Sequence, residues 1–134
     1  MGGISEFRHF VDHSSHGRLI VRAHTHVNLL GWVEMAIFAS VYYIIPRIVR
    51  RPIYSIGLVK AHFWIHNIGL IGMVVFFSIA GVAGSTVEAA ASAEAVVAPL
   101  LATMGIFGSL VLLANFIWAF NIFRTCKGWE KNDA

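Results

Sequence analysis

Three long apolar stretches, separated by short polar segments, dominate the pattern along the chain. Residues 61–87 and 95–123 contain no Asp, Glu, Lys or Arg, and residues 23–46 contain only Glu34. A helix needs about 20 mostly apolar residues to cross a bilayer. The pattern therefore predicts an all-α integral membrane protein with three transmembrane helices, over residues 24–45, 57–82 and 99–123.

The ends of these helices and the segment before them give the domain organisation. Pro46 is expected to end the first helix, because proline disfavours helical geometry in the preceding residue, and Pro99 suits the first turn of the third. Before the first helix, apolar and histidine side chains alternate as in a short amphipathic helix at the membrane surface. We therefore expect an N-terminal interfacial segment (1–21), a three-helix membrane domain (22–125) and a cytoplasmic tail (126–134).

The composition supports the membrane assignment. Hydrophobic residues make up 57% of the chain and charged residues 13%, whereas soluble domains carry about 25% charged residues. This balance excludes a soluble globular enzyme. It also excludes a nucleic-acid-binding protein, although the sequence pI is about 9.4.

The basic residues predict an orientation in the bilayer. With three helices, the N-terminus and the loop 83–98 share one side, and the turn 47–60 and the tail share the other. Most Lys and Arg residues fall on the second side, which the positive-inside rule places in the cytoplasm. We expect the bacterial inner (cytoplasmic) membrane, with the N-terminus outside and the C-terminus cytoplasmic. The basic residues are Arg8, Arg18 and Arg22 on the first side, and Arg47, Arg50, Arg51, Lys60, Arg124, Lys127 and Lys131 on the second.

Two histidines near the start of the first helix are candidate cofactor ligands. Ionisable groups inside a bilayer are costly and mark functional sites by default. His24 and His26 are two residues apart, about 200° around an α-helix, so they point to opposite faces. They indicate two separate sites, or one site and one histidine bonded to a neighbouring helix. Neutral imidazole is the usual ligand for haem iron and for copper.

A second group of ionisable residues lies deeper in the predicted bundle. His62 and His66 are four residues apart and share a helix face, so both could bind one metal ion. Their depth separates them from His24 and His26. Glu34 lies nearer the depth of His66, which favours a hydrogen bond, a shared proton or a metal site between the two.

Other polar and small residues have simpler interpretations. Asn115 and Asn121 are expected to bond across helices, and Gly105 with Ser109 is a small-residue pair suited to close helix contact. Three N-terminal histidines form either a surface copper or zinc site or, preferably, a solvated polar face: His9, His13 and His16.

The sequence resembles part of a known family. The stretch AHTHVNLLGWVEMAIFASVYYIIPRI resembles the tenth helix of subunit I in haem-copper oxidases, most closely the cbb-type cytochrome c oxidases and related nitric oxide reductases, in its H-x-H, LGWV and YY-x-x-P-R motifs. KAHFWIHNIGLIGMVVFFSIAGVAG is similar to the eleventh helix, and LATMGIFGSLVLLANFIWAFNIFRT, less specifically, to the twelfth. The resemblance implies that His24 corresponds to the ligand of the high-spin haem and His26 to that of the low-spin haem.

The resemblance also implies what this chain would need from elsewhere. In the family, the second low-spin ligand, the three copper histidines and the active-site tyrosine lie on other helices, so complete oxidase or reductase activity is not expected from this chain alone. His66 and Glu34 depart from the family pattern, which has small or apolar residues there.

The first hypothesis is a small membrane protein binding haem b, acting in electron transfer or in binding O2 or NO. It would form a homo-oligomer, with a trimer favoured by the family's pseudo-threefold architecture. The alternatives are a non-haem copper-binding membrane protein, or a split or accessory subunit of a respiratory oxidase or NO reductase complex. The haem hypothesis and the respiratory-subunit alternative would each involve a redox partner.

Overall fold

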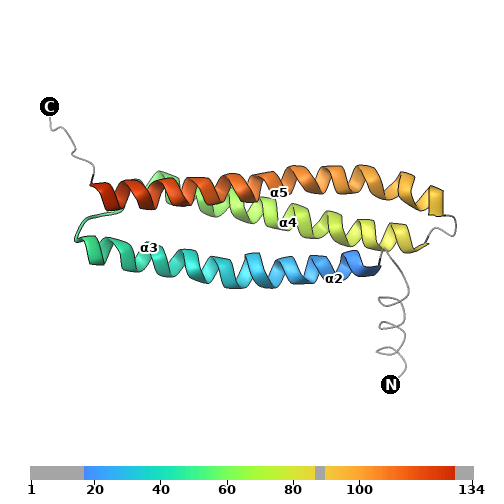
Figure 1. Cartoon of the computed structure of the whole chain (residues 1–134), viewed down its shortest axis with the longest axis horizontal. Helices are drawn as coiled ribbons and strands as arrows, with labels where there is room; N and C mark the ends of the chain where they lie inside the picture. Colours follow the sequence, from blue (N-terminus) through green and yellow to red (C-terminus); the bar gives the residue numbers. More distant parts are fainter. Residues whose placement is uncertain (1–16, 87–89, 129–134) are drawn as a thin grey trace, which may run out of the picture.

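The computed structural model describes residues 17–86 and 90–128 and shows three long helical rods lying side by side (Figure 1). The first rod consists of α2 (Gly17–His26), the π-helix η1 (Val27–Glu34) and α3 (Met35–Val49). The second is α4 (Ile56–Thr86) and the third is α5 (Ala90–Lys127). Each rod is long and apolar enough to cross a membrane. The predicted all-α fold with three transmembrane helices is confirmed.

The helices run further than the prolines predicted. α3 continues through Pro46 to Val49, because the Pro46 carbonyl still accepts hydrogen bonds from the amides of Arg50 and Arg51. The helix stops where Arg50 adopts a left-handed conformation, with φ of 53°. Pro99 lies inside α5 rather than at its start.

At the other end, α2 already begins at Gly17, before the expected start of the membrane domain at residue 22. The remainder of the expected interfacial helix, with His9, His13 and His16, lies outside the described residues.

The middle rod forms the core of the bundle. In its most apolar window, α4 is 39% buried, against 6% for the first rod and 11% for the third. Its packed face includes Leu70, Met73, Phe77 and Ala80. The two outer rods therefore keep most of their surface for lipid or for other chains.

Two glycines of α4 allow α5 to pack closely. A Cβ on Gly69 would lie 2.9 Å from the backbone oxygen of Phe107, and a Cβ on Gly72 would collide with the Phe107 ring. The predicted small-residue pair, Gly105 and Ser109, does not lie at this contact between α4 and α5. Gly105 and Ser109 are exposed, and a Cβ on Gly105 would meet nothing within 4 Å. The apolar pattern of α5 is too uniform to show which of its faces meets α4.

We expect Gly69→Ala to destabilise the protein by about 1–3 kcal/mol, the usual cost of overpacking a closely packed site. The added methyl group would meet backbone atoms of α5, which cannot move without separating the helices. Gly105→Ala is the matched control and should be neutral or slightly stabilising, because alanine favours helix more than glycine. Thermal unfolding in mild detergent measures both, and equal effects would contradict the assigned packing face.

The turn between α3 and α4 is attached to α5 by polar side chains. Asn121 is fully buried; its Oδ1 accepts from the Ser55 amide at 3.1 Å, and its Nδ2 donates to the Ser55 carbonyl at 3.0 Å. The Thr125 hydroxyl accepts from the Tyr54 amide at 3.0 Å. Asn121 thus bonds to a neighbouring segment, as predicted, although that segment is a turn rather than a helix.

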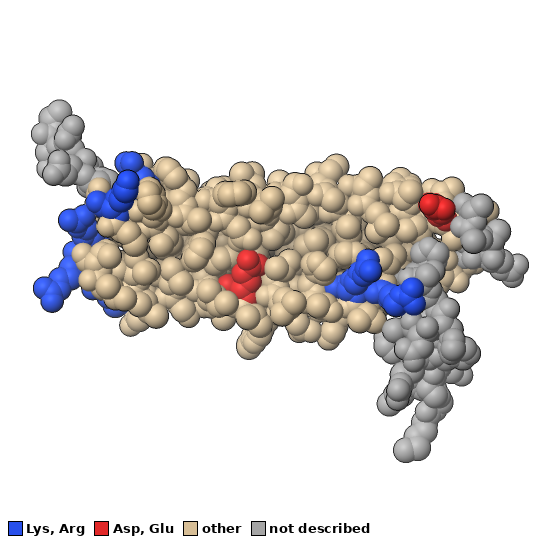
Figure 2. All heavy atoms as spheres, viewed as in Figure 1, with Lys and Arg blue, Asp and Glu red and all other residues tan. Residues whose placement is uncertain are grey.

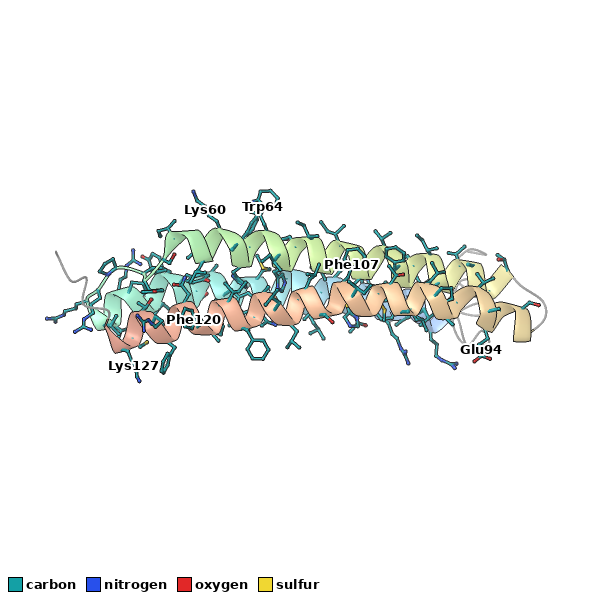
Figure 3. The ribbon with its side chains drawn as sticks, turned by 90° about the horizontal axis from the view of Figure 1, so that it is seen from above. Lys60, Trp64, Glu94, Phe107, Phe120 and Lys127 are labelled. Atoms are coloured by element: carbon teal, nitrogen blue, oxygen red, sulfur yellow. The ribbon has the colours of Figure 1, made fainter. Side chains whose placement is uncertain are left out.

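The charged residues gather at the ends of the bundle. Figure 2 shows most Lys and Arg side chains at the end where α3 and α5 terminate, with one acidic residue halfway along the visible face. Figure 3 shows Lys60 and Lys127 toward this same end and Glu94 at the opposite one. The Lys and Arg residues that the sequence assigns to the turn 47–60 and the C-terminal end therefore lie toward the same end of the bundle.

Candidate haem ligands and a mid-membrane pocket

His24 and His26 lie on different faces of α2, as the rotation argument required. The His26 ring packs against Phe77 of α4, with centroids 5.0 Å apart. His24 is exposed, and its Nε2 accepts a hydrogen bond from the Asn28 amide nitrogen at 2.9 Å. One histidine therefore faces inside the bundle and the other faces its surroundings.

The hydrogen bond of His26 leaves one ring nitrogen available. Its Nδ1 lies 2.7 Å from the Arg22 carbonyl oxygen. A carbonyl only accepts, so Nδ1 carries the proton and Nε2 of the neutral ring keeps its lone pair. A backbone carbonyl bonded to the second nitrogen is the usual way in which a metal-ligating histidine is oriented. His26 thus fits the role of an axial haem ligand through Nε2.

His24 would need to exchange one bond for another before it could bind iron through Nε2. That atom is engaged by Asn28, one turn further along the same rod. The bond is exposed and local, so its loss costs little compared with a bond in the core. The residue therefore fits a ligand for a group outside the bundle.

His62 and His66 form a separate buried cluster around Phe38. Both histidines are almost fully buried, and the Phe38 ring contacts them edge-on, with centroids 4.6 Å and 5.6 Å away. The two imidazole centroids lie 5.9 Å apart. His66 precedes Phe77, the neighbour of His26, by 11 residues of α4, or about 16 Å along the helix. The expected separation in depth between the two histidine pairs is present.

The predicted hydrogen bond between Glu34 and His66 is not formed. His66 Nε2 instead lies 3.1 Å from the Leu30 carbonyl oxygen, to which it donates. Leu30 belongs to the π-helix, whose i→i+5 hydrogen bonds give each turn more residues than an α-helix and rotate the residues that follow. Neither Glu34 Oε2 nor His66 Nδ1 has a hydrogen-bond partner.

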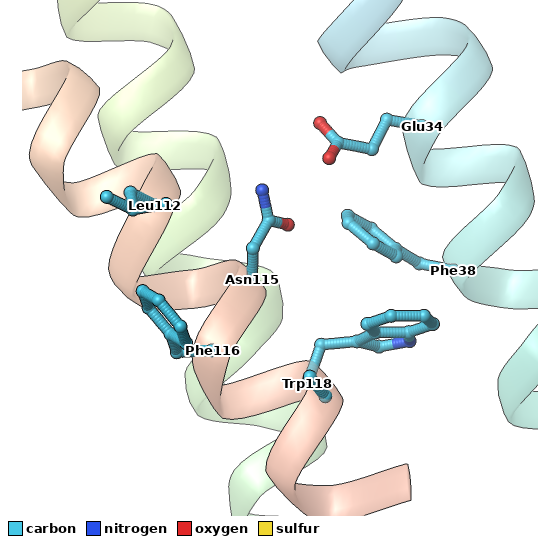
Figure 4. A pocket seen from close by; sticks show the side chains of 7 residues that line it. Glu34, Phe38, Leu112, Asn115, Phe116 and Trp118 are labelled. Carbon is cyan, nitrogen blue, oxygen red and sulfur yellow. The ribbon is translucent and has the colours of Figure 1, made fainter.

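Glu34 faces a pocket between the first rod and α5. The pocket has a volume of about 320 Å³. Figure 4 shows the Glu34 carboxylate and the Asn115 amide extending toward the same space, above the rings of Phe38 and Trp118. Asn115 Oδ1 is buried without a hydrogen-bond partner, so the bond predicted for it across helices is not made through this atom. The lining consists of Glu34, Phe38, Leu112, Asn115, Phe116, Trp118 and Ala119.

The pocket includes residues that the sequence did not single out. Asn115 was noticeable as a polar residue in an apolar helix. Phe38 and Trp118 had no such signal, because aromatic side chains are frequent throughout these helices. Within residues 17–86 and 90–128, no three His, Cys, Asp or Glu side chains come together as metal ligands, so Glu34, His62 and His66 do not form a three-ligand site.

The fold and the histidines define a class: an integral membrane helical protein with a candidate cofactor-ligating H-x-H pair. Comparison with known proteins gives the family. Residues 1–111 match the family described as Cytochrome C and Quinol oxidase polypeptide I, and the chain belongs to this family.

Several curated relatives are similar to the chain. Cytochrome c oxidase subunit 1 of Rhodobacter capsulatus is 32% identical over 114 residues, which cover 76% of this chain and 21% of the relative. A cytochrome c oxidase subunit 1 homolog of Agrobacterium tumefaciens (strain T37) is 27% identical over 122 residues, covering 82% of this chain and 23% of the relative. The Cbb3-type cytochrome c oxidase subunit CcoN1 of Stutzerimonas stutzeri is 34% identical over 61 residues, which cover 45% of this chain and 13% of the relative. The chain thus spans less than a quarter of the length of these relatives.

Proposed function

We propose that this chain is a membrane-embedded unit that binds haem b, with His26 as an axial ligand of one haem and His24 as a ligand of another. The observation that carries the proposal is the hydrogen bond from His26 Nδ1 to the Arg22 carbonyl, which leaves Nε2 free for iron. Family membership supports it. Bound haem would supply one-electron transfer or an iron position for O2 or NO.

The chain's own residues would hold the haem from two sides of α2. His26 would present Nε2 while Phe77 restrains its ring from α4. His24 faces away from the bundle, so a haem on that side would lie between this chain and a neighbour. A second axial ligand would come from another protomer or subunit.

We further propose a homo-oligomer, with a trimer favoured, in the bacterial inner membrane. The exposed small-residue surface of Gly105 and Ser109 on α5 offers a face for close contact between protomers. The proposed C-terminal cytoplasmic orientation is supported by the basic residues at that end of the bundle, because positive charge is retained on the cytoplasmic side. Those described are Arg47, Arg50, Arg51, Lys60, Arg124 and Lys127.

A buried histidine pair supports copper binding as a second candidate. His62 Nε2 and His66 Nδ1 are both buried without hydrogen-bond partners on one face of α4. Imidazole nitrogen suits copper. Two ligands leave the coordination incomplete, so a copper ion there would need donors from another chain.

One purified sample tests these alternatives. The chain is produced in a bacterial membrane with added haem precursor, purified in mild detergent, and examined by optical spectroscopy, metal analysis and native mass measurement. The proposal expects a Soret band that shifts on reduction, iron in stoichiometric amount, and an oligomer of this chain alone. Copper without a Soret band would replace haem with the second candidate. Larger co-purifying subunits would identify an accessory subunit of a respiratory complex.

A further inference from the structure

The pocket between the first rod and α5 has two buried oxygen atoms that need hydrogen-bond donors, beside one buried donor without a partner, Trp118 Nε1. Glu34 Oε2 and Asn115 Oδ1 both lack partners among the described residues, and both line the pocket of about 320 Å³. A carboxylate and an amide oxygen are acceptors. An unpartnered buried acceptor is costly, so an occupant that donates hydrogen bonds would stabilise the site.

The position of Glu34 along its helix determines which groups could reach it. Glu34 is 16 residues after Arg18 and 15 before Val49, the two ends of the first membrane-spanning segment. At 1.5 Å per residue this is roughly 20 Å or more from either end. Lipid headgroups lie outside the hydrocarbon region, about 30 Å thick, and do not extend to this depth.

The walls of the pocket favour a cationic donor. Phe38, Phe116 and Trp118 supply aromatic surface beside the carboxylate, and a cation near an aromatic face is attracted by the ring. The side chains that line the pocket offer only the Glu34 carboxylate and the Asn115 amide oxygen, fewer than the six to eight oxygens that Ca²⁺ takes. An ammonium or guanidinium group matches both the acceptors and the aromatic walls.

The rim of the pocket can receive another helix. Leu112 and Phe116 of α5, which line the pocket, are 57% and 66% exposed. Described Lys and Arg side chains of this chain lie near the ends of the helices. A second copy would therefore place none of these cations at the depth of Glu34.

We propose that the Glu34–Asn115 pocket is a docking site for a transmembrane helix of a different polypeptide that carries a lysine or arginine at mid-bilayer depth. Its charged group would pair with Glu34 Oε2 and donate to Asn115 Oδ1. This contact uses residues distinct from His24 and His26, so it stands whether or not haem is bound.

A synthetic helix tests the proposal directly. The probe is an apolar Leu/Ala peptide of about 20 residues with one central lysine, and its reference has leucine at that position. Cys126, the single cysteine, is exposed and carries the donor fluorophore. Energy transfer in phosphatidylcholine vesicles then measures association. We expect the lysine peptide to bind at least about fivefold more tightly than the leucine peptide, in keeping with polar contacts between membrane helices.

Variants of this chain identify the partner groups. Glu34→Gln should remove the preference for lysine, and Asn115→Leu should reduce it. Glu94→Gln is the matched control, because Glu94 is exposed near the other end of the bundle and should keep the preference intact. Helical content and thermal unfolding of each variant show that the fold is retained. Equal binding of the two peptides, or a preference that persists in Glu34→Gln, would overturn the proposal. So would saturation of the site by free butylammonium with no preference for the helix-borne lysine.

Discussion

Replacing His26 with alanine is expected to abolish the low-spin haem spectrum and to weaken haem binding at that site at least about tenfold, since even an outer hydrogen-bonding partner of a ligand is worth 10- to 100-fold. The reason is geometric. The Arg22 carbonyl fixes the proton on Nδ1 and leaves Nε2 as the ligating atom, and alanine offers no ligand in its place. Reduced-minus-oxidised spectra and haem extraction measure the loss.

His24→Ala is the matched control for this prediction. His24 is on the opposite, exposed side of α2 and contacts Asn28 rather than α4. Its replacement should leave the low-spin spectrum in place and remove only the haem assigned to the outer face. A low-spin spectrum that survives His26→Ala unchanged would move the ligand to His24 or His66.

Asn121→Leu is expected to destabilise the protein by about 1–3 kcal/mol, the cost of leaving a polar group without its hydrogen-bond partner. That group is the part-buried amide of Ser55, in the turn between α3 and α4; the Ser55 carbonyl loses Asn121 Nδ2 but still accepts from the Val59 amide. Leucine has similar volume but neither donor nor acceptor. Thermal or denaturant unfolding in detergent gives the difference.

Asn67→Leu is the comparison for Asn121. Asn67 donates only to the Phe63 carbonyl one turn earlier in its own helix, and that carbonyl keeps its place in the helical hydrogen-bond ladder. Its replacement should cost well under 1 kcal/mol, as for side chains that make no essential contact. A loss for Asn67→Leu as large as that for Asn121→Leu would contradict the assigned role of the turn contacts.

The transmembrane helices were predictable from the sequence because bilayer thickness sets a minimum apolar length. All three stretches exceed that length, and charges interrupt them only near their ends and at Glu34. The ends were less predictable. Pro46 and Pro99 indicate helix boundaries, yet both lie within helices. Proline is tolerated inside membrane helices because neighbouring groups satisfy the backbone atoms that it leaves without partners.

The arrangement of the polar residues was only partly predictable. The opposite faces of His24 and His26 followed from two-residue spacing within regular α-helix, which α2 retains. The predicted hydrogen bond between Glu34 and His66 is absent because residues 27–34 form a π-helix, which changes the direction of the Glu34 side chain. His66 donates to the Leu30 carbonyl instead. The sequence of Val27–Glu34, mostly apolar apart from Asn28 and Glu34, does not signal this change of winding.

The pocket shared by the first and third rods has a consequence for biosynthesis. Proteins are made from the N-terminus, so Glu34 enters the bilayer before the ribosome has made α5, which carries Asn115. A charged side chain at the centre of an inserting helix costs about 2.5–3.5 kcal/mol. The first rod also has the lowest mean hydropathy of the three, 1.6 against 2.1 and 2.2. The step most sensitive to this carboxylate is therefore insertion of the first helix by the translocon. An apolar substitution at Glu34 should make this insertion more favourable. It would also remove the group that the assembled bundle presents to its proposed partner.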